Sequence, residues 1–425
     1  MHTLVTLLGD PKIQSDGSYV ETTYQFENGN KSSLTSYTSF AIKEQFKPDK
    51  MVVLGTTKSA WHLLIKYCLL KNQMPNNQEP IHSLLSRLKA DYDKDAVRQS
   101  DLNEAAKLLS SIDKDHCCYE LRLIPYGRNK NEQTETLQIM MDCFADNKQS
   151  QEATLDVSNG LRHLPMLMQQ SALLLQSLRG VKINNIFYGA FNIAQDNITP
   201  IMALDGMLEI DRWTKALHRY EQDGDYTAFK EPLQHEKLPN NALTALGEAA
   251  YYERIFNLTE AGKHLAIIKK HLPDKFDGIG GFFTKQFNKH IAWSDNLALQ
   301  ERQSDLAHFY LNQGDFVRAA IFGVEAFITS LLLSTEKRNQ QNFRTRNRAS
   351  KEFKSSSESG QISSRGDIAL YPTFEKLSRI RNSLAHGTEA QQDIAHLMIN
   401  PTDLKSCLLE LFDLLGINKE KDDNL

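Results

Sequence analysis

The chain has 425 residues, enough for two or three domains with their own cores, which excludes a single small module. Hydrophobic residues make up 40% and charged residues 24%, which excludes a disordered or collagen-like chain. With 49 Lys and Arg against 53 Asp and Glu, the formal net charge is −4, so the molecule lacks the overall basic character that binds duplex nucleic acid, and any nucleic-acid contact must be local.

The first residues carry no basic segment before a short apolar run, and no stretch of about 18 apolar residues stands out later, so we expect a cytoplasmic protein. The five cysteines are scattered without C-x-x-C spacing, which predicts buried free thiols. His116 precedes Cys117 and Cys118, but adjacent cysteines chelate one ion poorly, so we expect no metal site.

The first 200 residues alternate short β-type runs with helical stretches. Leucines spaced three, four and seven apart predict a helix over residues 160–178, and a hairpin insertion is predicted over 19–26 with a turn at Asn28 and Gly29. This alternation predicts a doubly wound α/β domain over residues 1–200, with a parallel sheet between two layers of helices. The strand candidates are residues 4–8, 51–54, 119–124, 153–157 and 183–187.

Beyond residue 205 the strand signals fade and long amphipathic runs follow, at 208–220, 243–256 and 304–333, the last with a turn at 312–315. We therefore predict an all-α remainder, divided into a helical connecting region, 201–300, and a C-terminal helical domain, 301–425.

Between residues 337 and 366 the composition changes to Arg, Lys, Ser, Asn and Gln, which predicts a loop or disordered insertion in that helical domain. Its basic residues form either a plain solvated loop or a guide for single-stranded RNA, and they are Lys337, Arg338, Arg344, Arg346, Arg348, Lys351, Lys354 and Arg365.

The loops after four of the predicted strands are rich in glycine and hydroxyl residues, at the sheet edge where α/β domains bind ligands. Lys58, Arg128 and Arg162 add positive charge, and two of the loops run into helix N-termini, so a polyanionic ligand is favoured. The chain has neither G-x-x-x-x-G-K-[ST] nor G-x-G-x-x-G, and strand-to-helix turns use the same residue types for structural reasons. The candidate ligand-binding residues are Gly9, Gly55, Thr56, Thr57, Lys58, Ser59, Tyr126, Gly127, Arg128, Asn129, Asp156, Ser158, Asn159, Gly160 and Arg162.

A second set of candidates is Arg381, Asn382 and His386, which contains an R-x4-H spacing. On an ideal helix Arg381 and His386 lie about 140° apart, whereas Asn382 and His386 share a face. An imidazole that moves a proton, a guanidinium that holds a phosphate and an orienting amide suit RNA cleavage by the ribose 2′-hydroxyl, which needs no metal. The alternative is an incidental histidine on a surface helix that ends at Gly387.

Together these features resemble the CRISPR-associated CARF-HEPN ribonucleases of type III systems. The resemblance is carried by residues 7–9, 52–61 and 155–162, and by the R-x4-H motif at 381–387. It implies an N-terminal Rossmann-like CARF domain, which in a homodimer or higher homo-oligomer binds a cyclic oligoadenylate, tetra-adenylate favoured, as the allosteric activator. No cofactor is implied.

The resemblance further implies a C-terminal HEPN domain in which Arg381, Asn382 and His386 of two protomers form one cleft. That cleft cuts single-stranded RNA and leaves a 2′,3′-cyclic phosphate and a 5′-hydroxyl, and two chains would relieve the 140° separation. Two other functions stay open. One is a non-catalytic nucleotide-sensing protein that controls a partner, and the other is a CARF domain that itself degrades the cyclic oligoadenylate.

Overall fold

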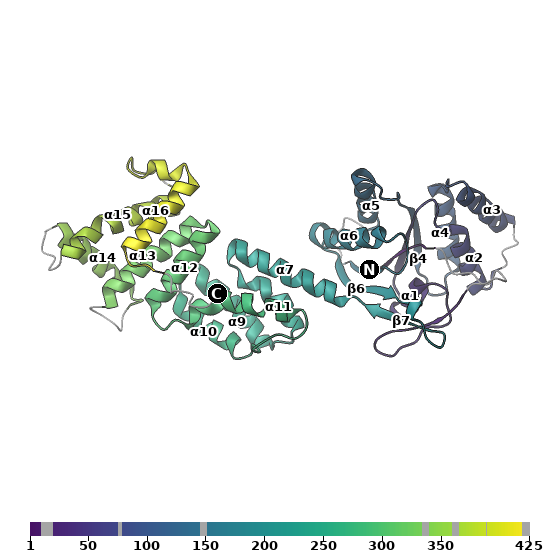
Figure 1. Cartoon of the computed structure of the whole chain (residues 1–425), viewed down its shortest axis with the longest axis horizontal. Helices are drawn as coiled ribbons and strands as arrows, with labels where there is room; N and C mark the ends of the chain where they lie inside the picture. Colours follow the sequence, from purple (N-terminus) through teal and green to yellow (C-terminus); the bar gives the residue numbers. More distant parts are fainter. Residues whose placement is uncertain are drawn as a thin grey trace. The chain divides into compact units, whose positions relative to one another are not determined.

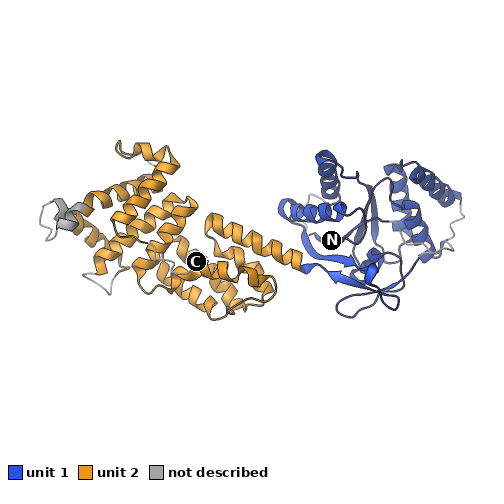
Figure 2. Ribbon diagram, viewed as in Figure 1, with its two compact units in different colours: residues 1–205 blue, residues 206–425 orange. Residues whose placement is uncertain are grey.

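The computed structural model describes residues 1–9, 20–74, 79–144, 151–333, 340–358, 365–387 and 389–418. The chain forms two compact units, Met1–Asp205 and Gly206–Leu425 (Figure 2). The first unit is α/β and the second is helical, as the sequence predicts.

The first unit is built on a seven-stranded sheet with the order β2-β7-β6-β5-β1-β3-β4. Five of its strands match the five predicted runs, and they pair in parallel around the central strand β1. The strands are β1 His2–Leu7, β2 Thr23–Gln25, β3 Lys50–Gly55, β4 Cys118–Leu123, β5 Glu152–Asp156, β6 Lys182–Gly189 and β7 Ile198–Ala203.

The sheet is mixed rather than wholly parallel, because β7 runs antiparallel to β6 and β2 pairs with β7. The prediction missed β7 because Pro200 lies within it, and a proline inside a short apolar run argues against a strand. The predicted turn at Asn28 and Gly29 is present, with Gly29 at φ +85° and an antiparallel bridge between Gln25 and Lys31. Of the hairpin's predicted start, Tyr19 lies outside the described residues.

Helices cover the sheet on both faces, as alternating side chains on the strands require (Figure 1). Leu4, Met51 and Val53 share one apolar cluster with residues of α1, α2, α3 and α4, while α5 and α6 pack together on the other face. The helices are α1 Thr38–Phe46, α2 Trp61–Lys71, α3 Glu79–Asp93, α4 Gln99–Ile112, α5 Lys130–Asp142, α6 His163–Arg179 and the 3-10 helix η1 Phe191–Ile193.

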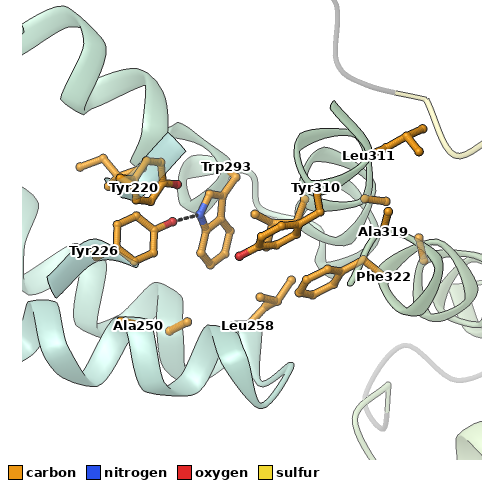
Figure 3. Packing of buried hydrophobic residues seen from close by; sticks show 14 of the residues in the cluster. Tyr220, Tyr226, Ala250, Leu258, Trp293, Tyr310, Leu311, Ala319 and Phe322 are labelled. Atoms are coloured by element: carbon orange, nitrogen blue, oxygen red, sulfur yellow. Dashed lines mark hydrogen bonds between the residues drawn. The ribbon is translucent and has the colours of Figure 1, made fainter. Parts of the chain in front are cut away.

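The second unit has one continuous core that joins the predicted connecting region to the predicted C-terminal domain. Trp213 and Tyr226 come from the first of these regions and Tyr310 and Phe322 from the second, and Figure 3 shows part of this packing with the hydrogen bond of 2.7 Å from Trp293 Nε1 to the Tyr226 hydroxyl. The sequence analysis predicted a boundary between two regions at residue 300, whereas in the structure both regions belong to one compact unit.

The elements of this unit are α7 Asp205–Asp223, η2 Tyr226–Phe229, α8 Lys230–His235, α9 Asn240–Arg254, α10 Leu258–Lys269, α11 Gly280–Ile291, η3 Ala292–Asp295, α12 Leu299–Gln313, α13 Phe316–Leu333, α14 Phe343–Glu358, α15 Arg365–His386, η4 Ala395–Met398 and α16 Pro401–Leu414. The predicted turn at 312–315 separates α12 from α13, with Gly314 at φ +78°.

Helix α13 is long and apolar enough to cross a membrane by length and composition, with a mean hydropathy of 1.8 over 18 residues, which the sequence inspection overlooked. In the structure 56% of this stretch is buried, and α13 packs on α12, α14, α15 and α16. The central helix of a helical core meets the same criteria as a membrane span, and its burial assigns α13 to the core.

The insertion predicted as a loop contains helix α14, which is a correction to the sequence interpretation. The helix docks because Arg346 and Phe353 contact α13, and Phe353 also contacts α15. Of the basic residues predicted there, Lys337 and Arg338 lie outside the described residues, and nothing is described of the Arg365 side chain. A hydrophilic composition predicted disorder, but the contacts of two residues, Arg346 and Phe353, anchor this polar helix.

Candidate functional site

A cavity of about 470 Å³ lies at the carboxyl ends of the central strands. Strand β1 lies between β3 and β5, with β4 beyond β3 and β6 beyond β5. The loops after these strands therefore open a crevice where the strand order reverses direction. Nine of the fifteen predicted ligand residues line it, drawn from all four predicted loops. They are Gly9, Gly55, Thr56, Lys58, Ser59, Tyr126, Ser158, Asn159 and Gly160.

The loop after β3 is held by hydrogen bonds within the cavity wall. Ser59 Oγ accepts from the Thr56 amide at 2.9 Å and donates to the Leu8 carbonyl at 3.2 Å, and the Trp61 indole donates to the Thr56 carbonyl at 2.9 Å. Gly55 fits beneath this turn, since a Cβ there would lie 2.6 Å from Trp61 Cζ2 and 2.9 Å from Ser59 Oγ. The turn therefore needs glycine at 55 for space.

The loop after β5 is organised by Asp156, which is fully buried and does not line the cavity. Its carboxylate accepts hydrogen bonds from the Thr6 hydroxyl at 2.8 Å, from the Ser158 amide at 3.0 Å and from the Ser158 hydroxyl. Ser158 Oγ in turn accepts from the Gly189 amide at 2.7 Å. Burial raises the pKa of Asp156 against the opposing effect of these hydrogen bonds. Asp156 thus holds the loop in shape for its neighbours.

Two predicted ligand residues in the cavity wall, Lys58 and Tyr126, donate hydrogen bonds to groups of the protein itself. The Lys58 ammonium donates to the Tyr92 and Asp93 carbonyls at 3.0 and 3.1 Å, at the C-terminal end of α3. Thr57 and Tyr126 donate hydroxyl hydrogen bonds to Asp95, the latter at 2.7 Å, and these bonds lower the pKa of Asp95, that from Thr57 most. The hydroxyl protons of Thr57 and Tyr126 are therefore used within the protein, and the Lys58 ammonium is directed toward the end of α3.

The remaining predicted ligand residues lie outside this cavity. Arg128 pairs with Glu132, Nε to Oε1 at 3.1 Å, and lies over the Tyr126 ring at 5.2 Å, while Asn129 caps α5 by accepting from the Glu132 amide. Gly127 has φ +76°, and Arg162 is exposed at the start of α6. The structure brings these residues to the same edge of the sheet, beside the cavity rather than in its wall.

A second cavity of about 180 Å³ adjoins the first and shares Gly9, Ser158 and Asn159 with it. Its other walls hold the aromatic residues Tyr24, Tyr37, Tyr188 and Phe191, with Thr38 and Asn192 as polar neighbours. Burial raises the pKa of Tyr24 to about 12, so its hydroxyl stays neutral. The sequence analysis missed this aromatic cavity because its residues come from β2, α1 and the end of β6, which lie far apart in the sequence.

The predicted catalytic residues lie at the end of α15 in the second unit. Arg381 is partly buried and its Nε is enclosed without a hydrogen-bond partner among the described residues, while Asn382 and His386 are exposed. Gly387 ends the helix with φ +59°, its amide donating to the Ser383 carbonyl at 3.0 Å. Arg381 therefore lies toward the packed side of the helix and His386 toward solvent, as the 140° separation predicts.

Among the described residues no group of three or more His, Cys, Asp or Glu side chains is placed to hold a metal ion. The described cysteines are free, and all but Cys118 are buried.

Comparison with known proteins points to one family for the first unit. Residues 3–192 match the family model described as CRISPR system endoribonuclease Csx1, CARF domain. The chain is 22% identical over 300 residues to the CRISPR-associated protein MJ1674 of Methanocaldococcus jannaschii, an alignment that covers 68% of this chain and 46% of that protein, so the chain spans about half the length of this relative. The solved structure of Enterococcus italicus Csm6 bound to cyclic hexa-2′-fluoro-hexa-dAMP covers 99% of this chain and 96% of that one, with a TM-score of 0.41 and 13% identity.

Proposed function

We propose that this chain is a CRISPR-associated ribonuclease activated by a cyclic oligoadenylate, because residues 3–192 match the family model of the Csx1 endoribonuclease CARF domain. It acts in the cytoplasm in type III antiviral defence and cuts single-stranded RNA without a metal. The observation that carries the proposal is the family match over a unit in which residues from all four predicted ligand loops line one cavity.

The two adjoining cavities of the first unit suit the two parts of a nucleotide. The larger one offers glycine backbone, the Thr56 hydroxyl and the amide of Asn159, which can donate hydrogen bonds to phosphate and ribose oxygens. The smaller one offers tyrosine rings and an asparagine, which suit a planar base. A cyclic oligoadenylate presents both in repeated units, and a twofold arrangement of two CARF domains would contact both faces of its ring. Tetra-adenylate is the favoured size.

In the second unit Arg381, Asn382 and His386 would carry the chemistry of a HEPN site. An imidazole removes the proton from a ribose 2′-hydroxyl, the resulting oxygen attacks the adjacent phosphorus, and the bond from phosphorus to the 5′-oxygen breaks. The products are a 2′,3′-cyclic phosphate and, after protonation of the leaving oxygen, a 5′-hydroxyl. The guanidinium stabilises the charge that develops on the phosphate.

The different orientations of Arg381 and His386 favour a cleft made by two copies of the chain. A mixture of Arg381→Ala and His386→Ala proteins tests this, because dimers of one copy of each retain one intact arginine and one intact histidine. Activity of the mixture above that of either variant alone supports a shared cleft. Activity no higher than that of the separate variants contradicts it.

The central experiment incubates the full chain with labelled single-stranded RNA, with and without cyclic tetra- or hexa-adenylate, in the presence of EDTA. We expect cleavage that depends on the ring, and a loss of about 100-fold or more in the His386→Ala protein. His271→Ala, an exposed histidine of the same unit, is the matched control and should cut normally.

Each other function predicts a different result in that experiment. A non-catalytic sensor binds the ring and cuts no RNA in any variant. A CARF domain that degrades its activator consumes the ring in His386→Ala protein, whereas persistence of intact ring counts against that activity. Equal cleavage by wild type and His386→Ala contradicts the assigned catalytic role.

A further inference from the structure

Helix α14 carries a stripe of exposed basic residues on the face opposite to the one that docks. At about 100° per residue, Arg344, Arg348 and Lys351 fall within about 60° of one another around the helix. All three are exposed, and the Arg348 side chain retains 58% of its accessible surface. Ser355 extends the same stripe by another turn.

The opposite face is anchored by two residues seven positions apart. Arg346 Nη1 donates to the Thr329 hydroxyl at 3.0 Å, and Nη2 lies 2.6 Å from the Glu325 carboxylate on α13. The Phe353 ring centroid lies 5.4 Å from that of Phe327 on α13 and 5.9 Å from that of Phe374 on α15. By the same helical geometry, these anchors lie about 180° from the stripe. The docking thus fixes which basic residues face outward.

The chain as a whole carries a net charge of −4, so this concentration of positive charge is a local feature. Glu352 is the one acidic residue among positions 343–355, and it flanks the stripe at 3.8 Å from Arg348. A helix rises about 6 Å from Arg344 to Arg348, comparable to the step between neighbouring phosphates in an extended strand. Arginine guanidinium groups bind phosphate oxygens in a forked geometry.

We propose that the stripe of Arg344, Arg348 and Lys351 on α14 binds the phosphate backbone of single-stranded RNA and guides it toward the end of α15. This inference rests on the proposed ribonuclease function. Phe353 contacts Phe374, which lies about 18 Å along α15 from His386 at 1.5 Å per residue. A strand of several nucleotides spans that separation.

The test measures binding of a labelled single-stranded RNA by fluorescence anisotropy between about 50 and about 200 mM salt. All proteins in this RNA-binding assay carry His386→Ala so that the RNA stays intact, whereas the cleavage and ring-binding measurements use the chain without that change. The stripe variant changes Arg344, Arg348 and Lys351 to Gln, and the control changes the exposed Lys270, Lys275 and Lys285 of the same unit to Gln, with the same loss of charge.

We expect the slope of log affinity against log salt to fall in magnitude by about 2 in the stripe variant, since each lost phosphate contact removes about 0.7. Counterion release then predicts a loss of affinity on the order of 100-fold near 0.1 M salt. A charge-retaining variant, with Arg344→Lys, Arg348→Lys and Lys351→Arg, should keep the slope. The control triple variant should also keep it.

An unchanged slope in the stripe variant, or an equal fall in the control, overturns the proposal while leaving the ribonuclease function intact. Failure of every protein to bind RNA, and of the wild type to cut it, overturns the proposed function itself. Binding of cyclic tetra-adenylate by the stripe variant should equal that of the wild type, and a parallel loss would show that the stripe serves the activator instead.

Discussion

The replacement of Gly55 by alanine tests whether the ligand cavity depends on the close packing of the loop after β3. An added Cβ would lie 2.6 Å from Trp61 Cζ2, where ordinary contact begins at 3.4 Å, so the two groups must separate by nearly 1 Å. Trp61 is fully buried and its indole is bonded to the Thr56 carbonyl, so the displacement passes into the cavity wall. Overpacking of this kind costs about 1–3 kcal/mol.

For a unit of this size, each kcal/mol lowers the Tm by about 2–4 °C, so we expect Gly55→Ala to lower it by about 2–12 °C. Calorimetry with cyclic tetra-adenylate should also show weaker binding, because Thr56 and Ser59 move with the turn. Gly247→Ala is the control, since a Cβ on that helical glycine meets nothing within 4 Å, and it should leave ring binding unchanged. A Gly55→Ala protein with wild-type Tm and wild-type ring affinity would refute the argument.

Three further predictions concern buried polar groups. Asp156→Ala should lower stability by about 2–4 kcal/mol and weaken ring binding, because the Thr6 hydroxyl and Ser158 amide lose their acceptor; thermal unfolding and calorimetry measure both. Burial raises the pKa of Glu253 to about 7, whereas in the unfolded chain it is near 4.5. The free energy of unfolding is therefore highest below about pH 4.5 and falls by about 3 kcal/mol as the pH rises to 7, because only the unfolded state then releases this proton. Urea unfolding at pH 5 and pH 8 measures this fall in unfolding free energy. The Glu253→Gln protein should not show it, whereas the control Glu248→Gln, at an exposed position, should show it as the wild type does. Arg346→Gln should release α14 from α13. Hydrogen-exchange measurements should then show faster exchange of the α14 backbone amides, while the exchange rates in α12 stay unchanged.

The α/β unit could be predicted from the sequence because its strands are buried on both faces. Val52 and Val53 of β3 are almost wholly enclosed, and continuous apolar runs of this kind mark central parallel strands. At the edge of the sheet this signal fails. Strand β7 contains Pro200, and its pairing with β2 depends on tertiary contacts that no local pattern encodes.

The residue types in the loops predicted the place of the candidate ligand cavity. They did not predict which side chains point into that cavity. Asp156 ends β5 and Ser59 follows β3, the two strands that flank β1, as expected of ligand residues. The Asp156 carboxylate nevertheless points into the protein and accepts from the Ser158 amide in its own loop. Lys58 supplies a positive charge in the sequence, yet its ammonium is bonded to the end of α3. Loop sequences cannot show such partners, because Tyr92 lies 34 residues away.

The same limit explains why a basic, serine-rich segment was predicted to be unstructured. Hydropathy averages over all the faces of a segment, whereas docking requires only one. In α14 the partly buried Arg346 and Phe353 contact α13, and Phe353 also contacts α15, while the outward face of the helix is polar. A segment whose composition cannot form a core of its own can still form a helix on the core of its neighbours.

The net charge of the chain likewise does not predict local charge, since a value of −4 for the whole chain is compatible with a stripe of three basic residues. Whether such a surface binds an anion depends on how the helix that carries it is anchored, and for α14 that anchoring is set by Arg346 and Phe353.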